Sequence, residues 1–300
     1  MRFVLTDEQR DFASALESLL AGADTPTVAR AWADGDSGPG LKLWSRLAEL
    51  GVTDLARDAT PVEVCVAFEA LGRHAVPGPW VESAAYLPVL LGREVVDIAT
   101  VAVPPLVPLA LDADVADTVF LVDGDSVRSA EVGQMRRSID PTRRLFEVSP
   151  LDGFETGAGA PSSTTEAFDL AVLATSAQLL GLGEHLLDAS VAYVKQRRQF
   201  GREIGSYQAI KHRLADVRIA LDFARPLVFG AALAEVPASA AKVACADAAY
   251  LAARTALQVH GAVGYTRELD LSLWITKVRA LVTAWGTPAF HRARILEGLV

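Results

Sequence analysis

Arg-Arg-Gln-Phe-Gly-Arg-Glu-Ile-Gly-Ser-Tyr-Gln, at residues 197–208, joins two long helical patterns and decides the fold prediction. Apolar side chains recur at helical spacing over residues 168–199 before it and 206–233 after it, and the first helix would be about 50 Å long. Arg197 can grip a diphosphate through paired hydrogen bonds, and Phe200 can pack on a planar ring. The run therefore has the chemistry to hold an anionic cofactor, although a solvated basic helix end would show the same residues.

A second run, Gln-Val-His-Gly-Ala-Val-Gly-Tyr-Thr-Arg-Glu, occupies residues 258–268. It follows an alanine-rich helical pattern over residues 239–260 and precedes another over 269–285. Its glycines would let the backbone approach a ligand, and Gln258 offers a side-chain amide. A glycine that merely ends a helix would give the same pattern. The run ends in a single carboxylate, Glu268.

The N-terminal part, residues 1–95, is predicted to form a helical domain. Thr6 begins a capping box at the start of the first helix, and residues 41–50 predict a second. A third helix would open at Pro61 and end at Gly72.

Residues 96–152 change character and are predicted to form a small β unit. Short β-branched runs flank Asp123-Gly124, a dipeptide that favours a hairpin. Residues 153–165 are rich in Gly, Ser and Thr and predict a linker. Residues 166–300 predict four helices in an up-and-down bundle. The fold class is therefore mainly α, with an N-terminal helical domain, a reduced central β unit and a C-terminal four-helix bundle.

Composition narrows the class of protein. Hydrophobic residues make up 51% of the chain and the net charge is -9, which indicates a large core and argues against a nucleic-acid binder. No stretch approaches the ~20 uninterrupted apolar residues of a membrane span, and no apolar signal region opens the chain. Cys65 and Cys245 are predicted to be buried thiols, and the five histidines show no metal-ligand spacing. We expect a cytoplasmic protein without a metal site.

The chain resembles the acyl-CoA dehydrogenase family. Residues 193–208 resemble that family's Tyr-x3-Arg-x-Gln-Phe-Gly-x2-Ile-x2-Phe-Gln run, and residues 258–265 its Gln-x2-Gly-Gly-x-Gly-Tyr run. Residues 43–51 and 68–73 are similar to its helical first domain, so the resemblance covers most of the chain. It implies FAD-dependent α,β-dehydrogenation of an acyl-CoA thioester, with electrons passed on to an electron-transfer acceptor.

The resemblance also implies roles for particular residues. In this family the two runs contact the diphosphate end of an FAD that belongs to the neighbouring subunit, which implies an oligomer. The matching positions here are Arg197, Gln199, Phe200, Gln208, Gln258, Gly261 and Ala262.

The catalytic base is predicted from the same resemblance. In many members a carboxylate follows the Gly-x-Gly-Tyr segment, and Glu268 matches it. Other members carry the base early in the first bundle helix, where Ala171 stands here and cannot act. Glu268 is the only candidate, although a first-turn glutamate would also be favoured by the dipole of the following helix.

Three departures from the family pattern change the role that we expect for the chain. The Thr-Glu-Pro-x2-Gly-Ser-Asp and Trp-Ile-Thr stretches that wall the flavin ring are missing between residues 90 and 160. Ala262 replaces a glycine, and Thr276-Lys277 stands where many members have Arg-Asp. The chain is then most similar to the short subunit of actinobacterial heterotetrameric acyl-CoA dehydrogenases, a resemblance carried by residues 109–117, 140–144 and 264–271.

The leading hypothesis is a subunit that completes the FAD site of a larger partner subunit. Such enzymes often act on CoA thioesters of steroid side chains or other bulky acids. The alternatives are a self-sufficient homo-oligomeric dehydrogenase with Glu268 as base, a non-catalytic scaffold subunit, and the same fold recruited for another reaction.

Overall fold

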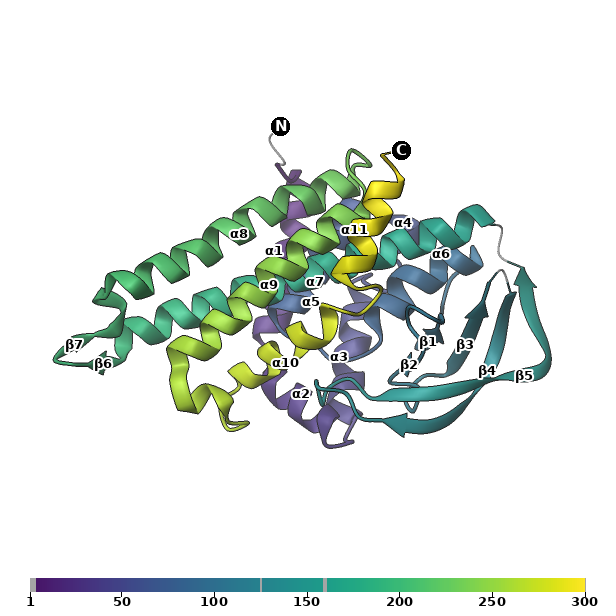
Figure 1. The fold of residues 1–300 in the computed structure, drawn as a ribbon. Coiled ribbons are helices and arrows are strands. Elements are labelled where there is room, and N and C mark those ends of the chain that lie inside the picture. Colours follow the sequence, from purple (N-terminus) through teal and green to yellow (C-terminus); the bar gives the residue numbers. More distant parts are fainter. Residues whose placement is uncertain (1–3, 125, 159–160, 300) are drawn as a thin grey trace.

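The computed structural model describes residues 4–124, 126–158 and 161–299. Figure 1 shows N-terminal helices, a twisted sheet and a set of long helices that run side by side. This arrangement confirms the predicted class, mainly α with a reduced β unit and a C-terminal helical domain.

Short helices build the N-terminal part. They are α1 (Asp7–Ala21), α2 (Thr25–Ala33), α3 (Gly38–Glu49), α4 (Leu55–Asp58), α5 (Pro61–Arg73), the π-helical η1 (Glu82–Tyr86) and α6 (Leu87–Leu91). The predicted capping box at Thr6 forms both of its hydrogen bonds, and Thr60 with Glu63 forms another at the start of α5. The prediction that Gly72 ends this helix is wrong, because α5 continues to Arg73 and Gly72 faces α7.

Five strands form one sheet in the order β1-β3-β4-β5-β2. Their bounds are β1 (Ala99–Ala102), β2 (Ala110–Leu111), β3 (Thr118–Asp123), β4 (Ser126–Arg136) and β5 (Leu145–Ala158). β1 pairs with β3 in parallel, and the other pairs are antiparallel. Val122 pairs with Val127 across the β3–β4 hairpin, which confirms the predicted hairpin, although Asp123 still belongs to β3 and pairs with Ser126.

The linker predicted over residues 153–165 is wrong on both sides. Residues 153–158 continue β5, where Glu155 pairs with Arg128 of β4, and α7 already begins at Pro161. Pairing with a neighbouring strand overrides the local composition, because strand preference depends on the partner as much as on the residue. The predicted division into domains at 1–95, 96–152 and 166–300 stays a prediction.

Long helices form the C-terminal part. They are α7 (Pro161–Gln196), α8 (Gln208–Ala232), α9 (Ala238–His260), α10 (Leu271–Leu281) and α11 (Pro288–Glu297). The fourth helix predicted over residues 269–285 is shorter than expected, and a separate helix follows it. Thr287 caps α11 by accepting a hydrogen bond from the Phe290 backbone, and Pro288 opens the helix as a first-turn proline.

The helix α7 is the central element of the fold. Residues Thr164–Gln196 are long and apolar enough to cross a membrane by length and composition, but 89% of their most apolar window is buried. The helix packs against α5, α8 and α9, so its apolar surface serves the protein core.

Two glycines bring α5 and α7 into backbone contact. A Cβ at Gly72 would lie 2.1 Å from the carbonyl oxygen of Gln178, and one at Gly181 would lie 2.0 Å from that of Glu69. Because only glycine permits this approach, the N-terminal helices and the long helices share one continuous core. The sheet has a second, smaller core that consists of Ala110, Ala113, Val119, Ala130 and Phe146.

Both thiols lie inside the helical core. Cys65 and Cys245 are free and buried, as predicted, and burial raises the pKa of Cys245 to about 12. Within the described ranges no group of three or more His, Cys, Asp and Glu side chains is placed to hold a metal ion.

Lys242 is fully buried beside the end of α10. Its Nζ donates hydrogen bonds to the carbonyl oxygens of Leu281 at 2.7 Å and Val282 at 3.2 Å. These carbonyls belong to the helix end, where unpaired acceptors favour a cation. Burial nevertheless lowers the pKa of Lys242 from 10.5 to about 7.

We expect Lys242→Met to weaken the pH dependence of stability. Between the folded pKa of about 7 and the unfolded value of 10.5, the unfolded chain binds more protons, so the unfolding free energy of the wild type rises with pH. Between pH 7 and 9 this gain is on the order of 2 kcal/mol, and the variant should lose it. Urea unfolding at both pH values measures the difference, and parallel pH profiles would contradict the assignment.

Candidate functional site

The two runs predicted to bind a cofactor meet at one end of the long helices. The rings of Tyr193 near the end of α7 and His260 at the end of α9 stack with centroids 4.1 Å apart. Arg197 follows one turn after Tyr193, and Gly261 directly follows His260. The stack therefore holds the two runs next to each other, although they are about sixty residues apart in the sequence.

A small hairpin forms the tip between α7 and α8. It consists of β6 (Arg198–Gln199), β7 (Arg202–Glu203) and the following 3-10 turn η2 (Ile204–Ser206). Phe200 and Gly201 make the turn with positive φ angles of 52° and 82°. The left-handed conformation is unfavourable for a phenylalanine, and it leaves the Phe200 side chain 92% exposed. Figure 1 shows this hairpin at the far end of the α7–α8 pair.

The cations around the tip are not neutralised by neighbouring acids. Six exposed cations make no ion pair with any described residue: Arg197, Arg198, Arg202, Lys211, Arg213 and Arg254. Further along α8, by contrast, Arg218 and Arg225 both pair with carboxylates. Positive charge is thus concentrated at this end of a chain whose net charge is -9.

A hollow of about 380 Å³ opens beside the tip between α8, α9 and the 3-10 turn η3 (Gly261–Tyr265). Gln258 lines it together with Arg213 and Arg254. Tyr265 also lines the hollow and is 76% exposed. The hollow thus offers an amide, two guanidinium groups and an aromatic ring to one ligand, beside the carboxylate of Asp216.

The structure places all seven predicted cofactor-binding residues at this end, and all are exposed. They are Arg197, Gln199, Phe200, Gln208, Gln258, Gly261 and Ala262. Their donor set fits the diphosphate and adenosine portions of FAD, because guanidinium groups bind phosphate oxygens and aromatic faces stack on planar rings. The surface is open, so these residues alone do not enclose a flavin ring. Their contact with a cofactor stays a prediction.

Glu268 lies in the loop between η3 and α10 and is exposed. Its side chain makes no hydrogen bond or ion pair with any residue in the described part of the chain. The chain alone therefore does not supply the burial on which a role as general base depends. The role of Glu268 stays a prediction, and Ala171 is buried inside α7.

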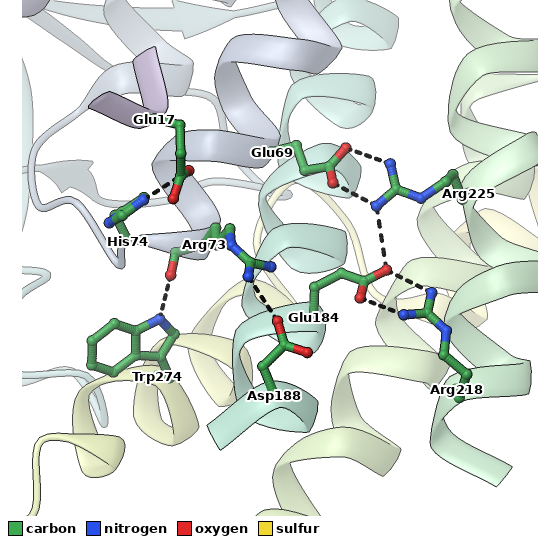
Figure 2. Close-up of polar contacts among 9 residues, drawn as sticks. All are labelled: Glu17, Glu69, Arg73, His74, Glu184, Asp188, Arg218, Arg225 and Trp274. Carbon is green, nitrogen blue, oxygen red and sulfur yellow. Dashed lines mark hydrogen bonds and ion pairs between the residues drawn. The ribbon is translucent and has the colours of Figure 1, made fainter. Parts of the chain in front are cut away.

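A network of ion pairs fixes the direction of α8, and the sequence did not predict it. Arg225 of α8 binds Glu69 of α5 through two hydrogen bonds of 3.0 and 2.6 Å, and also reaches Glu184 of α7 at 3.3 Å. Arg218 makes two bonds of 2.8 Å to Glu184, which is only 6% exposed (Figure 2). These hydrogen bonds raise the pKa of Arg218 above its ordinary value.

A second set of contacts anchors α10, which follows the second run. Asp188 pairs with Arg73 at 2.7 Å, and the Trp274 indole donates to the Arg73 carbonyl oxygen at 2.8 Å (Figure 2). The His185 ring stacks on Trp274 at 3.9 Å, and burial lowers the pKa of His185 to about 4. A neutral imidazole therefore packs against the indole at neutral pH. These contacts join α5, α7 and α10 close to the candidate site.

Comparisons with known proteins agree with this fold. Residues 157–300 match the family described as "Acyl-CoA dehydrogenase, C-terminal domain". The acyl-CoA dehydrogenase IpdE2 of Mycobacterium tuberculosis is 31% identical over 303 residues, covering 90% of this chain and 91% of the relative. The ChsE4-ChsE5 complex of Mycobacterium tuberculosis contains a chain with a TM-score of 0.85 at 21% identity, covering 100% of this chain and 99% of that one. A variant described as the Tcur3481-Tcur3483 steroid ACAD has a TM-score of 0.83 at 18% identity, covering 98% of both chains.

Proposed function

Because the chain belongs to the acyl-CoA dehydrogenase family of oxidoreductases, we propose that it is one subunit of a heteromeric enzyme and completes the FAD site of a larger partner subunit. The observation that carries this proposal is the position of the cationic tip. Figure 1 shows the tip and the five-stranded sheet at opposite ends of the molecule. A flavin held against the sheet of this chain would not reach its own tip, so the tip would serve a cofactor of another subunit.

The residues of the tip have distinct tasks in this proposal. Arg197 binds the cofactor diphosphate, Phe200 covers a planar ring, and Gln258 donates its amide from the adjacent hollow. The ion pairs of Arg218 and Arg225 hold α8 against α5 and α7, so the tip is presented in one orientation. The chemistry that FAD would supply at such a site is acceptance of a hydride from the acyl-CoA thioester.

Flavin content tests the proposal. We expect the chain purified alone to hold little FAD, because its cofactor-binding residues form an open surface. Production together with the larger subunit should give a yellow complex that oxidises an acyl-CoA thioester. The absorbance spectrum and the ratio of flavin to protein measure both results. Stoichiometric FAD and turnover in the single chain would sink the subunit-sharing model and favour a homo-oligomer.

The homo-oligomeric alternative depends on Glu268. If Glu268 is the base, Glu268→Gln should abolish turnover and leave the flavin bound; in the single chain the carboxylate is exposed, so its burial would have to come from another subunit. Loss of a true general base lowers the rate by about 10² to 10⁴. Steady-state turnover of the variant decides whether Glu268 has this role. A loss of that size with flavin retained would assign the base to Glu268.

We further propose that the acyl group is bulky, such as a steroid side chain. The support is the fold similarity to the Tcur3481-Tcur3483 protein, which is described as a steroid acyl-CoA dehydrogenase. The two-component structures also support a heteromeric assembly. A cytoplasmic location and transfer of electrons to a separate acceptor belong to the same proposal.

A further inference from the structure

Five arginines line one hollow on a different part of the molecule. The hollow has a volume of about 350 Å³ and contains Arg136, Arg137, Arg143, Arg144 and Arg267. It lies where the segment between β4 and β5 meets the end of α2 and the loop before α10. Two other hollows adjoin it: one of about 200 Å³ shares Ala33, Pro141 and Arg267 with it, and one of about 450 Å³ shares Ser138 and Arg143.

Two of the five arginines have partners that hold them in place. Arg136 pairs with Glu147 at 2.6 Å. Arg144 pairs with Asp114 at 2.9 Å and with the buried Asp112 at 3.8 Å, and it donates to the Trp32 carbonyl oxygen at 2.7 Å. Arg144 is only 8% exposed, yet its Nη2 has no hydrogen-bond partner within the described structure. A buried guanidinium nitrogen without a partner is costly unless a ligand or water supplies an acceptor.

The other three arginines make no direct contact with any described carboxylate, although the charge of Arg143 opposes the rise that burial causes in the pKa of Glu82 and of Asp112. The side chains of Arg137, Arg143 and Arg267 make no ion pair or hydrogen bond with any residue that the structure describes. Three like charges on one hollow repel one another, and a bound anion relieves that repulsion. The acids that line the adjoining hollows are Asp34 and the buried Glu82, and the chain as a whole carries a charge of -9. The excess of positive charge is therefore local and points to an anionic ligand.

We propose that this arginine hollow binds the phosphate groups of an adenine nucleotide. Arginine forks match phosphate oxygens in geometry and charge, and the hollow has the size of a small-molecule site. The identity of the nucleotide rests on the proposed function, which supplies two sources of the same chemistry. These are the phosphates of the CoA thioester and the diphosphate of FAD. In either case Arg143 and Arg267 would bind phosphate oxygens and Arg144 would form the buried floor.

Calorimetric titration of the full chain tests the site without a partner subunit or turnover. The probes are CoA, FAD and inorganic phosphate, each at low ionic strength because salt screens such contacts. The double variant Arg143→Gln/Arg267→Gln should raise the dissociation constant of the bound nucleotide by about tenfold or more. Arg93→Gln is the matched control, since Arg93 is exposed, makes no ion pair within the described residues and lies outside the hollow. The same titrations with Arg197→Ala, which changes only the cationic tip, show whether the nucleotide binds at the tip and not in the hollow.

The outcomes distinguish the sources and the site. If the double variant, but not the Arg93→Gln control, binds CoA more weakly, the hollow binds the substrate. If it binds FAD more weakly, the hollow binds the flavin. Equal affinity in the wild type and the double variant overturns the proposal, as does binding of no nucleotide to the wild type. Unchanged binding combined with lost assembly of the complex would instead identify a subunit interface and also overturn it. The single variant Arg267→Gln changes only one residue of an exposed loop, so weaker nucleotide binding by this variant would not be the result of a folding defect. The binding results do not depend on whether a larger subunit exists.

Discussion

Arg197→Ala is expected to lower the affinity of the assembled complex for FAD by about tenfold or more. A charge-assisted hydrogen bond to phosphate contributes about 1.5–3 kcal/mol, and the side chain makes no other described ion pair that would compensate. Phe200→Ala should add a smaller loss, about 0.5–1.5 kcal/mol, because stacking on the exposed ring would disappear. The ratio of flavin to protein after dialysis, followed by titration with FAD, measures both effects.

The control for this experiment is Arg46→Ala. Arg46 is an exposed arginine on α3 that makes no ion pair within the described residues, and it lies on a different element from the tip. Size-exclusion chromatography must show that the variant complexes still assemble. A fully assembled Arg197→Ala complex with unchanged flavin would favour the scaffold alternative, in which the tip stabilises a partner without touching the cofactor.

Gly181→Ala should destabilise the whole protein, although alanine favours helix over glycine. The new Cβ would lie 2.0 Å from the Glu69 carbonyl oxygen, so α5 and α7 would have to move apart. Overpacking of this kind costs about 1–3 kcal/mol or more, because a backbone atom cannot turn away as a side chain can. Separation of α5 from α7 would also strain the Glu69–Arg225 pair, which links α5 to α8. Urea unfolding gives the change in free energy.

Gly298→Ala is the matched control for that substitution. A Cβ at Gly298 would meet its nearest atom, the Ile295 carbonyl oxygen, at 3.6 Å, which is an ordinary contact. Its effect on stability should stay within about 0.5 kcal/mol, as for most surface substitutions. If Gly181→Ala unfolds at the same urea concentration as this control, the close helix contact does not limit stability.

Local sequence patterns predicted the helices well, but they did not predict which segments pair with each other as strands. The helix predicted over residues 239–260 is found as Ala238–His260, because an alanine-rich segment followed by glycine has few alternatives. Residues 153–158 looked like a linker, and only their pairing with β4 makes them a strand. The end of α10 at Leu281 has no local signal of this kind, because no Gly or Pro follows it before Gly286.

The candidate site likewise has one part that the sequence predicted and other parts that it did not. The tip could be predicted from the sequence, because the residues that would bind a cofactor there lie within a few positions of one another. The pair of Glu69 and Arg225 spans 156 positions, and nothing in either neighbourhood indicates the other. The arginine hollow was missed for the same reason, since Arg143 and Arg267 come together only through the packing of the sheet segment against the loop before α10.

The sheet takes part in both cores of the molecule. Ala110, Ala113, Val119, Ala130 and Phe146 form the smaller core, whereas Ala99, Val101, Phe120, Val122 and Val127 belong to the core that the helices share. Removing β1 or β3 would therefore expose apolar surface of the helices, and removing either set of helices would expose the apolar surface of the other. We expect the sheet to tolerate insertions at the ends of its strands that face away from the helices better than deletion of whole strands.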